Sequence, residues 1–201
     1  MSTEPDRHQK LAEQRGRVTP VQLAHIVRRT SRFDAMLSWY QTVLGAEVVH
    51  SDGMLAFLTY DAEHHRIAIA QIPGLEEQPQ TAAGTDHVAF TYADLGDLLY
   101  TYARLERAGI EPYWCINHGP TTSMYYKDPD GNRVELQVDN FPTAEEANRW
   151  MRSGAFAANP IGVVFDPQEL LARYRAGEAI DKLTARPPLP AGMTPFEMLR
   201  F

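Results

Sequence analysis

The sequence contains an internal repeat, and no other feature constrains the fold more strongly. A histidine in a short apolar stretch, residues 23–27 in the first unit and 87–90 in the second, is followed by a segment with apolar residues at helical spacing. These apolar residues are Phe33, Met36, Leu37, Tyr40 and Leu44 in the first unit and Leu95, Leu98, Leu99, Tyr102 and Leu105 in the second. The repeat therefore predicts two copies of one strand-helix unit.

Residues with cap propensity delimit both predicted helices. In the first unit, Thr30 or Ser31 is expected to be the N-cap and Gly45 to end the helix. In the second unit, Asp94 is the expected N-cap and Gly109 the terminating glycine.

Three further strands are expected after each helix, because short β-prone stretches alternate with turn residues. They span residues 47–50, 54–60 and 66–72 in the first unit and 111–118, 123–127 and 133–138 in the second, the last two joined by the turn 128–132 (DPDGN). Each unit thus has the predicted order β-α-β-β-β, and the predicted fold class is α+β.

The two modules, at about residues 20–72 and 84–138, are expected to pair into one domain spanning 18–140. The segment 73–84 between them is rich in Pro, Gly, Gln and Glu, as in a linker. Residues 1–17 are expected to be mobile. Residues 141–201 form a predicted C-terminal extension, helical at 143–152 and 167–175 and extended over the last fifteen residues, whose apolar end is expected to pack on the domain or on a neighbouring subunit.

Composition narrows the possible partners. The formal charge of -7 and the lack of a basic block argue against nucleic acid or an anionic membrane. The polar N-terminus does not resemble a signal peptide, and no apolar run is long enough to span a bilayer. The single cysteine, Cys115, excludes an intramolecular disulfide. A cytoplasmic protein that acts on a small molecule is expected.

His25 and His87 occupy equivalent positions in the two modules, so a pseudo-two-fold pairing of the modules would bring both into one cleft. Glu135 lies in the alternating strand 133–138, whose inward or outward sense the pattern leaves open. Two histidines and one carboxylate form the facial triad of non-haem Fe(II) oxygenases. The alternative interpretation is two core histidines and a solvated glutamate.

Residues 116–135 resemble the signature of the type I extradiol ring-cleavage dioxygenases. That signature requires a histidine, an apolar residue followed by tyrosine, Asp-Pro-any-Gly, and a glutamate. These elements correspond to His118, Met124-Tyr125, Asp128-Pro129, Gly131 and Glu135. The wider vicinal oxygen chelate superfamily shares paired β-α-β-β-β modules. The resemblance covers about residues 20–140, and the tail resembles the C-terminal extension of small one-domain members.

The resemblance implies a role for each of six residues. The metal ligands would be His25, His87 and Glu135, holding Fe(II), although Mn(II) uses the same ligand set. His65, in the run 64–70 (HHRIAIA), would be the acid-base group, and His118 and Tyr125 would hydrogen-bond the substrate. The expected reaction is cleavage of a small aromatic diol with O2, in a homo-oligomer, and the ring substituents are left open.

Two other functions compete with this one. A glyoxalase, epimerase or thiol transferase of the same superfamily would need a fourth protein ligand, and counting along the repeat from Glu135 leads to Gln71. A metal-free drug-binding protein would need no ligands at all. His65 and the signature around His118 favour the dioxygenase.

Overall fold

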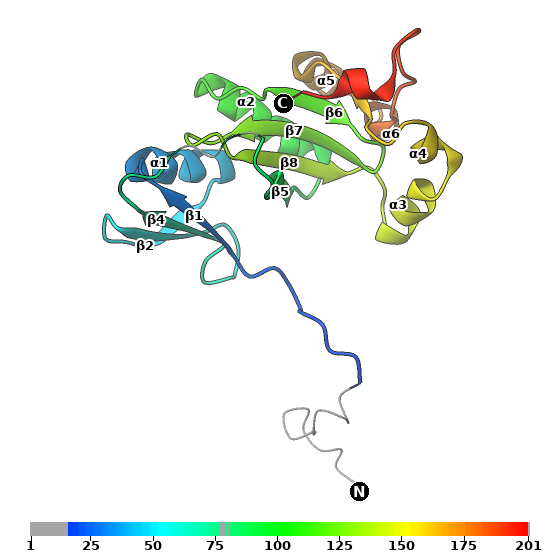
Figure 1. Cartoon of the computed structure of the whole chain (residues 1–201). Coiled ribbons are helices and arrows are strands. Elements are labelled where there is room, and N and C mark those ends of the chain that lie inside the picture. Colours follow the sequence, from blue (N-terminus) through cyan, green and yellow to red (C-terminus); the bar gives the residue numbers. More distant parts are fainter. Residues whose placement is uncertain (1–15, 77–78, 80, 201) are drawn as a thin grey trace, which may run out of the picture.

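The computed structural model describes residues 16–76, 79 and 81–200, and it contains two mixed sheets with helices packed on them (Figure 1). The first module consists of β1 (Ile26–Thr30), α1 (Phe33–Leu44), β2 (Glu47–Ser51), β3 (Leu55–Thr59) and β4 (Ile67–Gln71). The second consists of β5 (His87–Thr91), α2 (Leu95–Arg107), β6 (Trp114–Asn117), β7 (Thr121–Lys127) and β8 (Arg133–Asp139). The predicted α+β class and the β-α-β-β-β order of both modules are confirmed.

The two sheets share one topology. The strand orders are β1-β4-β3-β2 and β5-β8-β7-β6-β9, and in each module the first strand is parallel to the last while the other pairs are antiparallel. The repeat in the sequence is therefore a repeat in space. β9 (Val163–Val164), which has no counterpart in the first sheet, comes from the C-terminal extension.

Three of the four predicted helix boundaries agree with the structure. Gly45 ends α1 in the left-handed conformation, with φ 63°, and Asp94 caps α2 by accepting a hydrogen bond from the Asp97 amide at 2.9 Å. Gly109, with φ 73°, follows the last residues of α2. The N-cap prediction for α1 is wrong. Thr30 belongs to β1, where its hydroxyl accepts from the Arg32 amide, and Arg32 occupies the cap position, where no side chain makes a capping hydrogen bond.

Each sheet buries one face against the helix of its own module. Alternate residues of β3 and β4, among them Leu58, Ile67 and Ile69, pack with α1, and alternate residues of β7 and β8 pack with α2. These contacts form one continuous apolar core across both modules. The opposite faces of the sheets do not join this core, and exposed side chains such as Val27 on β1 and Thr91 on β5 lie there.

The modules contact each other through their helix sides. Arg28 Nε donates to the Tyr40 hydroxyl at 2.9 Å, and that hydroxyl donates to Asp128 in the second module at 3.1 Å. On α2, the Arg104 guanidinium donates to the carbonyls of Thr42 and Val43 at the end of α1. Polar contacts around α1 thus join the modules in addition to the shared apolar core.

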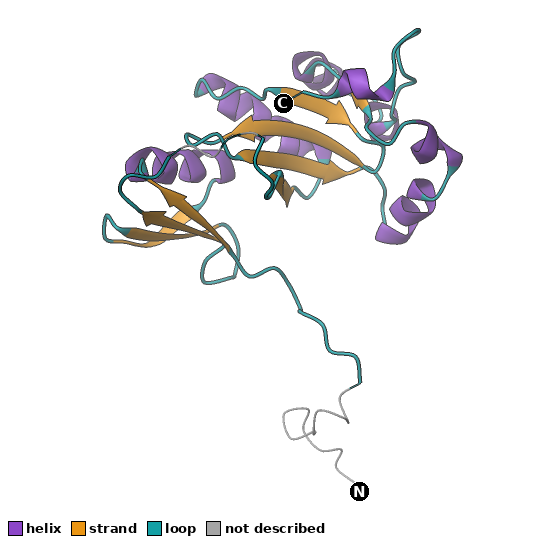
Figure 2. Ribbon diagram, viewed as in Figure 1, coloured by secondary structure: helices purple, strands orange, loops and turns teal. Residues whose placement is uncertain are grey.

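The C-terminal extension packs on the second sheet. It comprises α3 (Ala144–Met151), α4 (Gly154–Ala158), β9, α5 (Pro167–Arg175), α6 (Ile180–Thr184) and a 3-10 turn (Pro195–Met198). Figure 2 shows its helices gathered around this sheet and away from the first. The helices expected at 143–152 and 167–175 are present as α3 and α5, and residues 187–200 are irregular, with a turn at 191–192 and the 3-10 turn.

The mobile segment expected at 1–17 lies almost wholly outside the described residues. Within the described ranges, no helix has the length and apolarity needed to cross a membrane.

Candidate metal and substrate site

His87 and Glu135 lie side by side on neighbouring strands of the second sheet. His87 begins β5, and Glu135 pairs with Ala89 two residues further along it. Glu135 alternates with Val134 and Leu136, which pack against α2, so its carboxylate lies on the opposite face of the sheet. His87 Nε2 and Glu135 Oε2 are 3.0 Å apart, which places two potential metal donors together.

The charges of this pair are coupled. The hydrogen bond to Glu135 raises the pKa of His87 to about 9 against the opposing effect of burial, and Asp86 adds to the rise through the other ring nitrogen at 2.8 Å. Burial alone would raise the pKa of Glu135, but hydrogen bonds from His87 and Ser123 lower it overall. A divalent metal bound here would replace the shared proton, because ligating histidine must be neutral.

His118 and Tyr125 form the adjoining polar pair. His118 Nδ1 contacts the Ile161 carbonyl, which can only accept, so this nitrogen carries the proton. Burial lowers the pKa of His118 and keeps the ring neutral, and its Nε2 accepts from the Tyr125 hydroxyl at 3.0 Å. The Tyr125 ring packs edge-on against His87 with centroids 5.3 Å apart. Four of the six predicted site residues thus lie together on one face of the second sheet.

The other two predicted residues, His25 and His65, lie together on the first module. His25 immediately precedes β1 and His65 lies in the loop before β4, with ring centroids 4.4 Å apart. The Phe57 ring lies 4.7 Å from that of His65 on the same side. Burial, and then the neighbouring His25 and His64, lower the pKa of His65.

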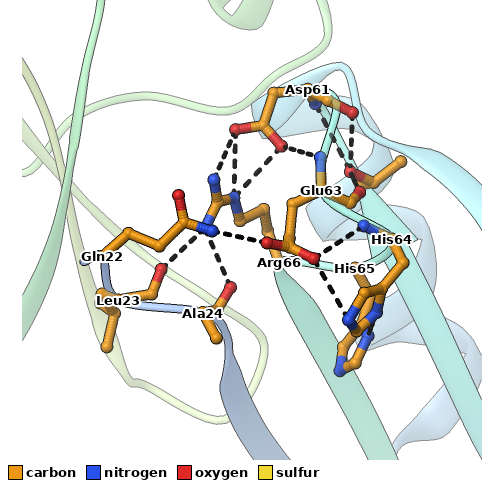
Figure 3. Close-up of polar contacts among 9 residues, drawn as sticks. Gln22, Leu23, Ala24, Asp61, Glu63, His64, His65 and Arg66 are labelled. Atoms are coloured by element: carbon orange, nitrogen blue, oxygen red, sulfur yellow. Dashed lines mark hydrogen bonds and ion pairs between the residues drawn. The ribbon is translucent and has the colours of Figure 1, made fainter. Parts of the chain in front are cut away.

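The loop before β4 holds the approach to β1 in place. Arg66 donates to the carbonyls of Leu23 and Ala24 at 2.7 and 3.1 Å, and its guanidinium pairs with Asp61 at 2.9 Å (Figure 3). Glu63 in the same loop accepts from Gln22 at 2.6 Å. These bonds fix the backbone on both sides of the contact between His25 and His65.

Among the described residues, His87 lies beside Glu135, whereas His25 contacts His65. Across the described residues, no group of three or more His, Cys, Asp or Glu side chains is arranged to hold a metal ion. One chain therefore provides two donors at the second module and one at the first, so the predicted triad stays a prediction.

Strand register changes the position expected for a fourth ligand. Glu135 pairs with the residue two after His87, and the residue two after His25 is Val27, which pairs with Ala68. Ala68 is therefore the counterpart of Glu135, and its methyl group cannot bind a metal. Gln71 pairs with Thr30 at the far end of β1, on the order of 15 Å from the His25 end at the usual rise per residue. The fourth ligand required by the glyoxalase-type alternative is thus missing from this module.

The contribution of the tail to the site could not be predicted from the sequence, apart from the apolar character of its end. Met198 packs with Ile116 and Tyr125 in a second apolar cluster, and its carbonyl accepts from Trp114 Nε1 at 2.9 Å. The Trp114 ring stacks on Tyr125 with centroids 4.6 Å apart. The extension therefore forms an apolar wall beside the tyrosine.

Replacing Arg186 by alanine should lower the free energy of unfolding by about 1–3 kcal/mol, because three carbonyl acceptors lose a charged donor. Arg186 donates to the carbonyls of His118, Asn159 and Ala155, and it lies over the Trp150 ring at 4.6 Å. Denaturant unfolding measures the loss, with Arg175→Ala, an exposed arginine in the last turn of α5, as the control. Equal stability of the two variants would contradict this account of the tail.

Two β-α-β-β-β modules that share one apolar core define the fold class, and His87 and Glu135 lie side by side on its second sheet. The chain belongs to the Glyoxalase/Bleomycin resistance protein/Dioxygenase superfamily, whose family model matches residues 22–136. It is 50% identical over 162 residues to biphenyl-2,3-diol 1,2-dioxygenase 2 of Rhodococcus globerulus, covering 80% of this chain and 85% of that protein. It is 47% identical over 171 residues to biphenyl-2,3-diol 1,2-dioxygenase 3 of the same organism, covering 84% and 90%.

Among solved structures, a glyoxalase/bleomycin resistance protein/dioxygenase domain from Frankia sp. EAN1pec has a TM-score of 0.52 at 16% identity, covering 64% of this chain and 98% of that one. This likeness concerns the fold alone. The likeness to the two Rhodococcus enzymes confirms the predicted resemblance to extradiol dioxygenases and the prediction of an oxygenase, and a metal cofactor follows from it.

Proposed function

We propose that this enzyme cleaves the ring of a biphenyl-2,3-diol or a similar aryl-substituted catechol beside its hydroxyl groups, with Fe(II) as the metal and O2 as the second substrate. The observation that carries the proposal is the grouping of His87, Glu135, His118 and Tyr125 on one face of the second sheet. The names of the two relatives supply the substrate class.

Imidazole and carboxylate groups are the ligands that bind Fe(II) in non-haem oxygenases, and the described residues of one chain bring two of them, His87 and Glu135, together. When bound, Fe(II) would hold the diol and supply the redox chemistry with O2. Both oxygen atoms enter the ring-opened product and the diol supplies the electrons, so no further reductant is required.

The neighbouring side chains would orient the substrate. Burial raises the pKa of Tyr125 well above its usual range, so its hydroxyl keeps the proton, which a substrate oxygen would accept in place of His118 Nε2. His118 Nδ1 is held by the Ile161 carbonyl, and its freed Nε2 would accept from a hydroxyl of the diol. Trp114 and Tyr113, partly buried in the cluster around Tyr125, are suited to contact the second ring of a biaryl substrate.

The test uses anaerobically purified protein loaded with Fe(II) and mixed with biphenyl-2,3-diol. Admission of air should give a yellow ring-fission product and consume about one O2 per diol, measured together by absorbance and an oxygen electrode. Oxygen uptake without the chromophore, or no uptake at all, would refute the proposal.

Glu135→Gln should abolish the chromophore and release the metal, because the amide loses the charge that binds the ion. Gln137→Ala is the matched control, since Gln137 lies on the same strand and face and, among the described residues, its side chain bonds only to Thr91. Metal content measured after desalting separates the two variants.

A further inference from the structure

We propose that the C-terminal extension selects the ring tautomer of His118, and that Asn159, the C-cap of α4, is the positioning residue through which it does so. Asn159 acts through the loop 159–162 and the backbone carbonyl of Ile161. The role of His118 toward the substrate rests on the proposed function, whereas its tautomer can be measured independently of any reaction.

The tautomer of His118 decides what its Nε2 can do. A neutral imidazole carries one ring proton, and the nitrogen without the proton is an acceptor. Nδ1 faces the Ile161 carbonyl, so the proton lies on Nδ1 and Nε2 accepts from the Tyr125 hydroxyl at 3.0 Å. Without this carbonyl the proton could move to Nε2, and that nitrogen could no longer accept from a hydroxyl of the diol.

The side chain of Asn159 fixes the loop that carries the carbonyl. Its oxygen accepts from the amides of Ile161 and Gly162 at 3.1 and 2.8 Å, and its nitrogen donates to the Gly162 carbonyl at 2.9 Å. An asparagine that accepts from amides further along its own backbone closes a tight turn. Asn159 is only 5% exposed, so the turn that aims the Ile161 carbonyl at His118 is held by buried bonds.

The loop also lies directly on the backbone of His118. Gly162 has φ 124°, and a Cβ at this position would lie 2.5 Å from the Asn117 carbonyl oxygen and 2.9 Å from His118 Cα. Arg186 joins the two segments, because its guanidinium donates to the carbonyls of His118 and Asn159 at 3.2 and 2.7 Å. The extension is therefore anchored to the second sheet on both sides of the Ile161 carbonyl.

The surroundings of the ring make its tautomer, and not its charge, the property that the extension controls. Burial lowers the pKa of His118, so the ring is neutral at neutral pH. Which nitrogen of a neutral histidine carries the proton is set by the hydrogen bond that the ring makes. Here that bond comes from the extension, while the acceptor nitrogen faces Tyr125 on the sheet.

Proton–nitrogen NMR correlation spectra test the tautomer directly. They are recorded at one neutral pH on the full chain with isotope-labelled histidine and Zn(II) as a diamagnetic metal, and the signals lost in His118→Gln identify His118. The wild-type ring should carry its proton on Nδ1, and Asn159→Ala should add a population with the proton on Nε2. A wild-type proton on Nε2, or an unchanged tautomer in Asn159→Ala, would overturn the proposal.

Kinetics with biphenyl-2,3-diol connect the tautomer to the proposed reaction. Asn159→Ala should lower kcat/KM of the Fe(II)-loaded enzyme by about 10–100-fold at unchanged metal content, because a misplaced acceptor orients the diol poorly. In a His118→Gln background the same replacement should change kcat/KM little, since its effect passes through His118. An equal loss in that background would show general damage and contradict the positioning role.

Three further variants control for stability and for the type of perturbation. Asn159→Asp keeps the bonds from the two amides and should retain most of the Nδ1 tautomer. Gly162→Ala displaces the loop by steric contact, so it should shift the tautomer as Asn159→Ala does, and it replaces that variant if circular dichroism shows that it does not fold. Asp94→Ala removes the N-cap of α2 and should leave the tautomer unchanged.

The tautomer and the reaction can fail separately. A chain in which Asn159→Ala shifts the His118 proton from Nδ1 to Nε2, but which leaves the diol uncleaved, would keep the tautomer selection and refute the proposed function. A chain that cleaves the diol, but keeps the same tautomer in Asn159→Ala and Gly162→Ala, would overturn the selection by the extension and leave the function intact.

Discussion

Replacing His65 by alanine should lower turnover by about 10²–10⁴-fold while the metal content stays at the wild-type level. A histidine that exchanges a proton with the diol contributes to the rate, but it does not bind the ion. The His65 ring lies against His25 at 4.4 Å and against Phe57 at 4.7 Å, so it is held beside the proposed ligand His25.

Steady-state kinetics with biphenyl-2,3-diol, together with metal analysis of the same samples, measures both quantities. His50→Ala is the control, because His50 is an exposed histidine on β2 of the same module. A parallel loss of metal and turnover in His65→Ala would show that His65 supports the ligands and would contradict an acid-base role.

Replacing Asp128 by alanine should lower the free energy of unfolding by about 3 kcal/mol or more, because several buried donors lose their acceptor together. The Asp128 carboxylate accepts from the amides of Asp130 and Asn132, from the Asn132 side chain and from the Tyr40 hydroxyl. Only 4% of Asp128 is exposed, so water cannot replace these bonds.

In a protein of this size such a loss corresponds to a fall in Tm of about 6–12 °C. Calorimetry measures it, and Asp139→Ala, which removes an exposed carboxylate at the end of β8, should change Tm little. Asp128→Asn keeps an acceptor for the turn and should lose less than the alanine variant. Equal Tm values for Asp128→Ala and Asp139→Ala would disprove the role of this network.

The repeat in the sequence predicts most of the fold because helical and strand periodicities are local. Both helices and the strands of both modules lie where apolar spacing and turn residues place them, with ends that shift by a few residues. The N-cap prediction for α1 fails because threonine is common both at helix N-caps and in strands. The burial of Thr30 in β1 decides for the strand.

The two halves of the site could be predicted to different extents. The predicted place of His87 in the first strand of its module is confirmed, and His87 meets Glu135 because β5 and β8 are neighbouring strands of one sheet. The position of His25 relative to this pair follows from contacts between the modules, among them the shared apolar core and the bond between Tyr40 and Asp128, which periodicity does not encode. Counting residues leads to Gln71 instead of Ala68 because the first module is shorter: Ile26 pairs with Ile67, 41 residues later, whereas His87 pairs with Arg133, 46 residues later.

The short strand β9 has a consequence for the solubility of the protein. It pairs with β6 through Ile116 and Asn117, at the edge of the second sheet. Without it, the backbone donors and acceptors of β6 would be free to pair with a strand of another molecule, which is a common route to aggregation. The C-terminal extension therefore covers the β6 edge of the sheet that carries the candidate site.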